Sequence, residues 1–208
     1  MRHLQLLLLL LCAASHTGAL THAADVGREV RVDRIEISGV TVLSATEVES
    51  TLELTVGEAL DRQKIMKSFE SLRTLYRNKG YESAVVKAQM SRIAGEAVLA
   101  LSIDEGLPTR VAKITFQAGE LRDDFDSDRW DQLIRDLDQK TREFELGVHE
   151  LEKVSGINRL IKEMLAAEDY IGVRVDEQVT EESPPTVTGT VPAAGRWVGL
   201  RFRIFPGE

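Results

Sequence analysis

The spacing of apolar residues over the first hundred positions predicts five elements in succession. Residues 30–38 have a near-alternating pattern typical of a strand, with one irregular step after Val32. Two amphipathic helices follow, a short one over 45–54 and a longer one from Asp61 to Gly80. Strands are then predicted at 82–91 and 98–104, where apolar and polar residues alternate. The order is strand, helix, helix, strand, strand, in about 77 residues, which is small but sufficient for a domain.

Polar residues and glycines mark the ends of these elements. Ser44 and Glu47 have the spacing of a capping box, in which each side chain bonds the other residue's amide. The carboxylate of Asp61 suits the start of the longer helix. Gly80 follows that helix where a left-handed C-cap is expected, and Tyr81 then leads into the strand. This helix-to-strand joint predicts how the flanking segments fold.

The same order of patterns returns after residue 108. Residues 111–116 repeat the apolar spacing of the first strand, and two amphipathic helices follow. Leu146-Gly147 is interpreted as the counterpart of Val56-Gly57, and Tyr170 as that of Tyr81. A strand begins at Val173, and after a connection rich in Pro, Gly and Thr the last strand covers 197–205. The chain therefore contains two similar units, residues 30–106 and residues 109–208.

The first unit also resembles a known family. Its segments ISGV, VGEALD, LRTLYRNKGY and VLALSIDEG, with ITFQAG just beyond, are similar to the POTRA domain. POTRA domains form the periplasmic part of outer-membrane assembly factors of the BamA and TamA type. The resemblance implies an α+β fold, with a three-stranded mixed sheet and two helices on one face of it. The positions that we assign to a structural motif are Gly39, Gly57, Tyr76, Gly80, Tyr81, Glu105 and Gly106.

Residues 109–208 resemble a second, divergent copy of the domain. Asp169 stands where the first unit has Gly80, and Pro206-Gly207-Glu208 replaces the closing Glu-Gly. Only Leu107 and Pro108 separate the units, so we expect them to be docked against each other. Related proteins carry such domains before a membrane-embedded β-barrel, and no run of barrel strands follows here. We therefore expect a stand-alone periplasmic module or a truncated form of a longer ancestor.

The first residues are typical of a secretory signal. Arg2 precedes the apolar run 4–14, which is shorter than the ~20 residues of a spanning helix, and small residues follow near Ala23. We expect a signal peptide over 1–23 and a linker over 24–29. Cys12 allows a lipoprotein interpretation, but Leu11 occupies the place of the expected small residue, so ordinary cleavage is favoured. The expected location is the periplasm of a Gram-negative bacterium, in association with its outer membrane.

Charge and composition exclude several classes of function. The chain has 26 basic and 34 acidic residues, a net charge of −8. Nucleic-acid binding proteins carry a basic surface, so nucleic acid is not an expected partner. Beyond the signal there is no cysteine, and His149 is the last histidine, so disulfides and Cys or His metal sites are not expected. We predict no cofactor and no small-molecule substrate.

The remaining catalytic and metal-binding patterns are incomplete. Asp124, Asp126 and Asp128 have the spacing of a calcium loop, but Arg129 and Arg135 replace its Gly and closing Glu. We interpret these acids as a solvated loop before a helix. His149 has no nucleophile motif to serve and is expected at the surface, while Tyr81 and Tyr170 are expected in the core. The chain is therefore not predicted to be an enzyme.

The kind of function that remains is binding of another protein through the backbone. The strand at 82–91 is expected at a sheet edge, where unpaired amides and carbonyls can pair with an incoming strand. The residues predicted to bind are Ala84, Val85, Val86, Lys87, Ala88 and Gln89. Lys87 can equally protect the edge from self-association, and Lys87→Pro is expected to remove an edge donor. The predicted partners are outer-membrane proteins or components of the β-barrel assembly machinery. The alternative is a structural docking arm for a barrel or secretion pore, without client contact.

Overall fold

The computed structural model describes residues 30–119, 127–186 and 193–205. The predicted signal peptide, the linker and Cys12 lie outside these residues. Asp124 and Asp126 of the incomplete calcium pattern, and the closing Pro206-Gly207-Glu208, also lie outside them.

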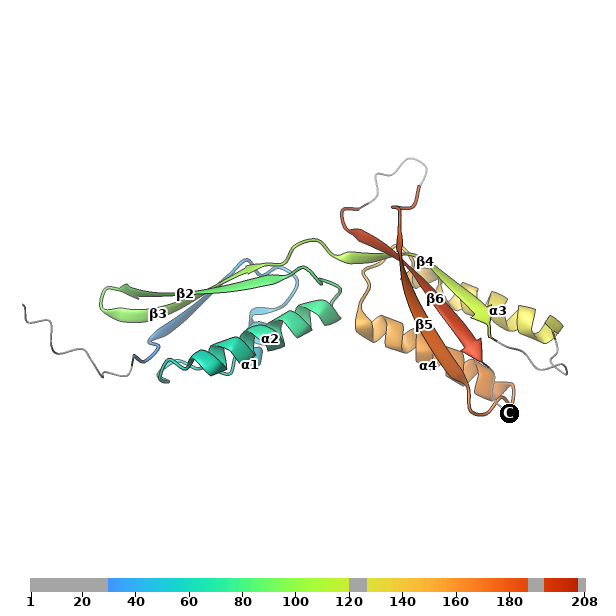
Figure 1. The fold of residues 1–208 in the computed structure, drawn as a ribbon, viewed down its shortest axis with the longest axis horizontal. Helices are drawn as coiled ribbons and strands as arrows, with labels where there is room; N and C mark the ends of the chain where they lie inside the picture. Colours follow the sequence, from blue (N-terminus) through green and yellow to red (C-terminus); the bar gives the residue numbers. More distant parts are fainter. Residues whose placement is uncertain (1–29, 120–126, 187–192, 206–208) are drawn as a thin grey trace, which may run out of the picture.

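The first unit has the predicted order of elements. It consists of β1 (Arg34–Ser38), α1 (Ala45–Thr51), α2 (Arg62–Asn78), β2 (Val85–Ile93) and β3 (Glu96–Asp104) (Figure 1). The last strand lies in the middle of the sheet, in the order β1-β3-β2. β1 runs parallel to β3, and β2 runs antiparallel to it. Because β3 is central, its two neighbours form the edges of the sheet.

The second unit repeats this topology. Its elements are β4 (Thr109–Ala118), α3 (Ser127–Thr141), the 3-10 helix η1 (Arg142–Phe144), α4 (Leu151–Ala167), β5 (Arg174–Glu182) and β6 (Arg196–Phe205). The order of the sheet is β4-β6-β5, again with one parallel and one antiparallel pair. In both units the helices pack on one face of the sheet (Figure 1). The predicted fold class, two α+β units with mixed three-stranded sheets, is confirmed.

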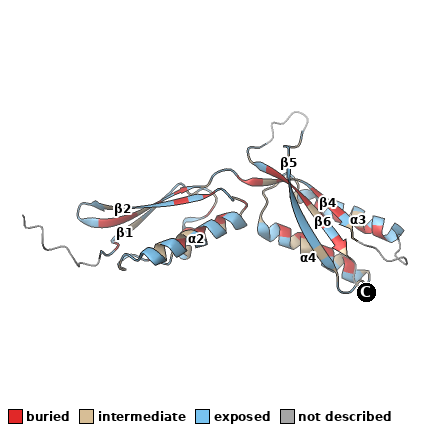
Figure 2. Cartoon of the chain, in the orientation of Figure 1, coloured by how far each residue is buried: buried red, intermediate tan, exposed pale blue. Residues whose placement is uncertain are grey.

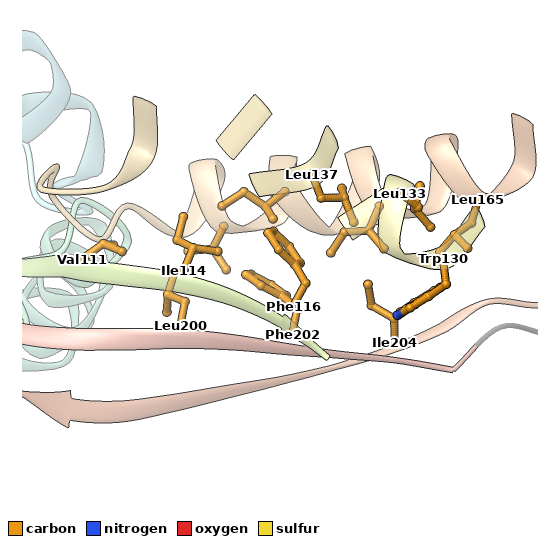
Figure 3. Packing of buried hydrophobic residues seen from close by; sticks show 13 residues of the cluster. Val111, Ile114, Phe116, Trp130, Leu133, Leu137, Leu165, Leu200, Phe202 and Ile204 are labelled. Atoms are coloured by element: carbon orange, nitrogen blue, oxygen red, sulfur yellow. The ribbon is translucent and has the colours of Figure 1, made fainter. Parts of the chain in front are cut away.

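The core of each unit fills the space between its helices and its sheet (Figure 2). In the first unit Leu72 and Tyr76 of α2 are fully buried and pack with residues of β2 and β3. In the second unit the rings of Phe116 and Phe202 stack with centroids 5.6 Å apart, and Leu137 lies above them (Figure 3). Because these residues follow the 3.6 and 2.0 periods of the sequence, the apolar pattern fixes which faces meet.

The helix ends use the predicted caps. Ser44 and Glu47 form the reciprocal capping box of α1, and the Asp61 side chain accepts from the amide of Gln63 at the start of α2. At the end of α2 the amide of Tyr81 donates to Tyr76 O over 2.9 Å, and Gly80 N donates to Arg77 O over 2.9 Å. This pair of bonds is a Schellman motif.

The irregular step in the first strand has a structural cause. We predicted a strand over 30–38, but β1 begins only at Arg34. Val32 turns away to bond the loop that precedes α2, donating to Glu58 O over 2.9 Å and accepting from Gly57 N over 2.7 Å. Its side chain is still fully buried. The second unit has the same three-residue spacing between apolar positions, and there a β-bulge between Val111 and Lys113 accommodates it.

Two further boundaries differ from the prediction. β2 starts at Val85 rather than residue 82, because a turn follows α2 in which Ala84 N donates to Tyr81 O over 3.4 Å. It also continues to Ile93, where the two-residue turn Ala94-Gly95 leads into β3.

The predicted match of Leu146-Gly147 with Val56-Gly57 is wrong by one residue. Leu146 N donates to Val111 O over 2.8 Å, as Gly57 N donates to Val32 O. Leu146 has φ +65° and Gly57 has φ +88°, so these two residues are the equivalent pair.

Candidate partner-binding edge

Each sheet has one edge that a loop covers at its beginning and one edge without such a loop. In the first unit the loop at 57–60 covers the segment just before β1. This loop forms backbone bonds with Val32 and pairs Ala59 with Arg31. The equivalent loop at 146–149 covers β4 by bonding Val111 and pairing Val148 with Arg110. For the residues that the structure describes, no backbone bond from another element reaches β2 or β5 on the outer side. β2 and β5 are therefore the edges that can accept another strand over their full length.

The register of β2 determines which of its peptide groups face outward. Ile93 pairs with Glu96 across a two-residue turn, so these residues exchange both backbone bonds. Hydrogen-bonded and non-hydrogen-bonded pairs alternate from there without a register shift. The outward peptide groups are consequently those of Val86, Ala88, Met90 and Arg92.

The register and the bounds of β2 correct two sequence-based expectations. The amide of Lys87 faces β3, where Lys87 pairs with Ser102, so Lys87→Pro would break the sheet rather than remove an edge donor. Ala88 is one of the four positions whose outward amide can be removed without loss of a bond to β3. Ala84 precedes the strand and is 7% exposed within the core, so it is not an edge residue. The predicted binding role of Val85, Val86, Lys87, Ala88 and Gln89 stays a prediction.

Glu105 closes the first unit by accepting from four donor groups of three residues. Its carboxylate accepts from the amides of Thr41 and Val42 over 2.8 and 2.9 Å, and from the hydroxyl of Thr41. The buried Tyr76 hydroxyl donates to it over 3.0 Å. Burial by itself would raise the pKa of the Glu105 carboxyl, but these bonds outweigh it, and the pKa lies below its ordinary value. Burial, followed by the bond to Glu105, raises the pKa of Tyr76.

The four glycines of the motif all have positive φ, but Gly80 carries an additional constraint. The angles are +81° at Gly39, +88° at Gly57, +84° at Gly80 and +66° at Gly106. A Cβ atom on Gly80 would lie 2.7 Å from both His149 O and the Val148 side chain of the second unit. Gly80 O also accepts from Thr109 N over 2.7 Å. Gly80 therefore ends α2 and at the same time lets the second unit approach.

The inter-unit joint contains groups that the sequence did not indicate. Arg196 donates from Nη1 to Glu82 over 2.7 Å and from Nη2 to Glu181 over 2.9 Å, which connects the two units. His149, expected at the surface, is half-buried at this joint. Its Nε2 is buried without a hydrogen-bond partner among the described residues. Because these contacts depend on how the units dock, apolar spacing within one unit contains no signal for them.

Among the described residues no group of His, Cys, Asp or Glu could hold a metal ion. Asp128 lies in the first turn of α3, and its neighbour Arg129 forms an ion pair with Glu168. No helix within the described ranges is long and apolar enough to cross a membrane.

A family model matches the first unit. It is the POTRA model, described as a surface antigen variable number repeat, and it covers residues 30–106. Residues 30–106 form a POTRA domain. POTRA domains are non-catalytic modules, and the second unit repeats the POTRA topology described above. Comparison with curated proteins gives no match.

Solved structures with POTRA domains are also similar to the chain. The BamA POTRA3-5 fragment from Haemophilus influenzae is 18% identical, with a TM-score of 0.40, and the match covers 86% of this chain and 61% of that one. CdiB from Escherichia coli is 16% identical, with a TM-score of 0.41 and coverage of 91% and 30%. POTRA1-2 of the periplasmic domain of Omp85 from Anabaena is 12% identical, with a TM-score of 0.40 and coverage of 84% and 94%. These superpositions are loose, so the fold assignment rests on the topology and on the family match.

Proposed function

We propose that this chain is a periplasmic POTRA-type binding module in outer-membrane protein assembly or transport. It recruits client or partner proteins by adding their extended segments to β2, in the envelope of a Gram-negative bacterium. The observation that carries the proposal is the open nine-residue edge with four outward peptide groups. Main-chain bonds supply affinity in such additions and tolerate varied sequences, which suits clients that become strands themselves.

Ala88→Pro tests this proposal. Proline removes one outward amide and leaves the bonds between β2 and β3 in place, because a Pro whose nitrogen faces solvent is tolerated on an edge strand. The probe is a synthetic peptide that copies the last strand of an outer-membrane β-barrel protein. Its affinity, measured by NMR titration or fluorescence anisotropy, should fall at least about tenfold in the variant.

Ala88→Ser is the matched control, since it changes the side chain at the same position and keeps the amide. It should bind the peptide as the unmodified chain does. Circular dichroism and thermal unfolding of both variants show whether the sheet is intact. Equal affinity of a folded Ala88→Pro variant and the unmodified chain would contradict binding at this edge.

The second candidate is a structural arm that holds an outer-membrane barrel or secretion pore in register, without client contact. The bonds from Thr109 to Gly80 and from Arg196 to Glu82 favour it, because they fix the units against each other. Crosslinking in cell envelopes separates the candidates. Crosslinks from β2 to many unfolded outer-membrane proteins support recruitment, whereas crosslinks only to one barrel protein or its lipoproteins support the arm.

A further inference from the structure

The two open edges have the same direction along the molecule. β5 runs toward the inter-unit joint and ends at Glu182, whereas β2 starts at Val85 and runs away from the joint (Figure 1). Each edge strand pairs antiparallel with the central strand of its own sheet. An extended segment that is antiparallel to β2 is therefore also antiparallel to β5, if it continues across the joint.

Arg196 holds the ends of these two edges together. Its guanidinium donates to Glu82, three residues before β2, and to Glu181, the last residue but one of β5. A surface groove of about 460 Å³ lies at the same place, lined by Glu82, Ser83, Leu107, Thr109, Gly195 and Arg196. The groove lies beside the residues that precede β2 and at the start of β6, so a segment that crosses the joint would pass there.

The two edges carry opposite charge. β2 contains Lys87 and Arg92 and no acidic residue. β5 contains one Arg and four acidic residues. Three of these acids form ion pairs at the surface: Asp176 with Arg174, Glu181 with Arg196 and Glu182 with Lys113. Glu177 forms no ion pair among the described residues. An exposed pair such as Asp176 with Arg174 is weak, so its carboxylate, like that of Glu177, is available to an incoming cation.

We propose that β5 and β2 form one composite docking edge for a single extended segment of another protein. The N-terminal half of that segment is acidic and lies along β2, and its C-terminal half is basic and lies along β5. This inference rests on the proposed function, because it adds a second half-site to the β2 edge. The antiparallel order follows from the somewhat greater stability of antiparallel pairing. The charge pattern then fixes which half lies on which edge.

Synthetic peptides test the composite edge with the chain that begins at residue 24. The full peptide has about 22 residues, enough for two nine-residue edges and a short crossing. Glu alternates with Val or Thr in its N-terminal half, and Lys alternates with Val or Thr in its C-terminal half. The two half peptides, and a full peptide with the halves exchanged, serve as comparisons. Fluorescence anisotropy should show the full peptide binding at least about 30-fold tighter than either half.

Two variants separate the half-sites. Insertion of Gly-Ser-Gly-Ser between Leu107 and Pro108 should reduce the affinity for the full peptide to nearly that of the acidic half, because the edges no longer align. Glu177→Lys should weaken binding of the full peptide and of the basic half, but not of the acidic half. Glu163→Lys, an equal charge change on the exposed face of α4, is the matched control and should change none of these affinities.

The outcomes distinguish the two proposals. If the acidic half binds and Ala88→Pro weakens it, but the full peptide binds no tighter, the composite edge is wrong and recruitment at β2 stands. If the acidic half does not bind and Ala88→Pro changes nothing, recruitment at β2 fails, and the composite edge fails with it. Tighter binding of the exchanged peptide would overturn the proposed order of charges.

Discussion

The two units reach the same topology with different residues at equivalent positions. Gly80 and Asp169 both follow the second helix of their unit with positive φ, +84° and +64°. Tyr170 N donates to Leu165 O over 3.0 Å, as Tyr81 N donates to the carbonyl of Tyr76. The Schellman motif is thus present twice, once with glycine and once with an aspartate. The fold requires the backbone conformation at this place, and not a particular side chain.

The location of each position explains which residue it tolerates. Asp169 is exposed and follows α4, which ends away from the joint (Figure 1). Gly80 lies at the joint, where a Cβ atom would come within 2.7 Å of His149 O. The polar contact from Tyr76 to Glu105 also belongs to the first unit only, because Leu165 takes the place of Tyr76 and has no hydroxyl. The residues specific to the first unit are therefore explained by the contact between the units at Gly80 and by the bond between Tyr76 and Glu105, and not by the topology that both units share.

Gly80→Ala tests the difference between the two units and should cause the largest loss of stability. An alanine with left-handed φ costs about 1–2 kcal/mol, and overpacking against His149 adds about 1–3 kcal/mol. We expect the free energy of unfolding of the first unit to fall by about 2–5 kcal/mol, measured by chemical denaturation. NMR shifts at Thr109 and His149 should also change, because the units can no longer approach as closely.

Gly156→Ala is the control for this variant. Gly156 lies within α4, and a Cβ atom there would meet nothing within 4 Å. Alanine in a helix interior is more stable than glycine by about 0.5–1 kcal/mol, so this variant should stabilise the second unit. Similar effects of the two substitutions would contradict the role of Gly80 at the joint.

Tyr76→Phe should have the next largest effect. It keeps the buried ring and removes the bond to the Glu105 carboxylate, which should lower the free energy of unfolding of the first unit by about 1.5–2 kcal/mol. Tyr81→Phe is the control, because the Tyr81 hydroxyl forms no hydrogen bond in the part of the chain that the structure describes. Equal losses in the two variants would mean that the bond to Glu105 contributes nothing specific.

The Glu105 carboxylate makes the first unit sensitive to acid, chiefly through its bonds to Thr41 and Val42 and to a smaller extent through Tyr76. The folded pKa of Glu105 is lower than its ordinary value of 4.5, so its contribution is complete above that pH. As the pH falls from 4.5 through the folded pKa, protonation removes this stabilisation. Glu105→Gln should therefore unfold at a midpoint that depends less on pH below 4.5 than that of the unmodified chain. An unchanged pH dependence in urea titrations would contradict this assignment.

Sequence spacing predicted the elements because each follows from local rules. Ser44, Asp61 and Gly80 mark helix ends through bonds to residues only a few positions away, and these ends are where the sequence placed them. The start of β2 was misplaced because the turn after Tyr81 keeps the alternation of apolar residues without pairing to β3. The outward peptide groups of the edge depend on register, and the bridge made by Arg196 depends on docking. Both features depend on contacts between residues far apart in the sequence, and the spacing of neighbouring residues gives no information about such contacts.

Asp169→Gly should have the smallest effect, and it tests whether the two C-caps are equivalent. Glycine adopts the left-handed conformation without steric cost, and the Asp169 side chain is exposed, so little packing is lost. We expect the free energy of unfolding of the second unit to rise by about 0.5–1 kcal/mol, measured by chemical denaturation. Asp169→Ala retains the steric cost without the carboxylate and should not stabilise, because the backbone conformation sets the requirement. If Asp169→Gly destabilised the unit, the aspartate would contribute a contact of its own, and its replacement of Gly80 would be more than a tolerated exchange.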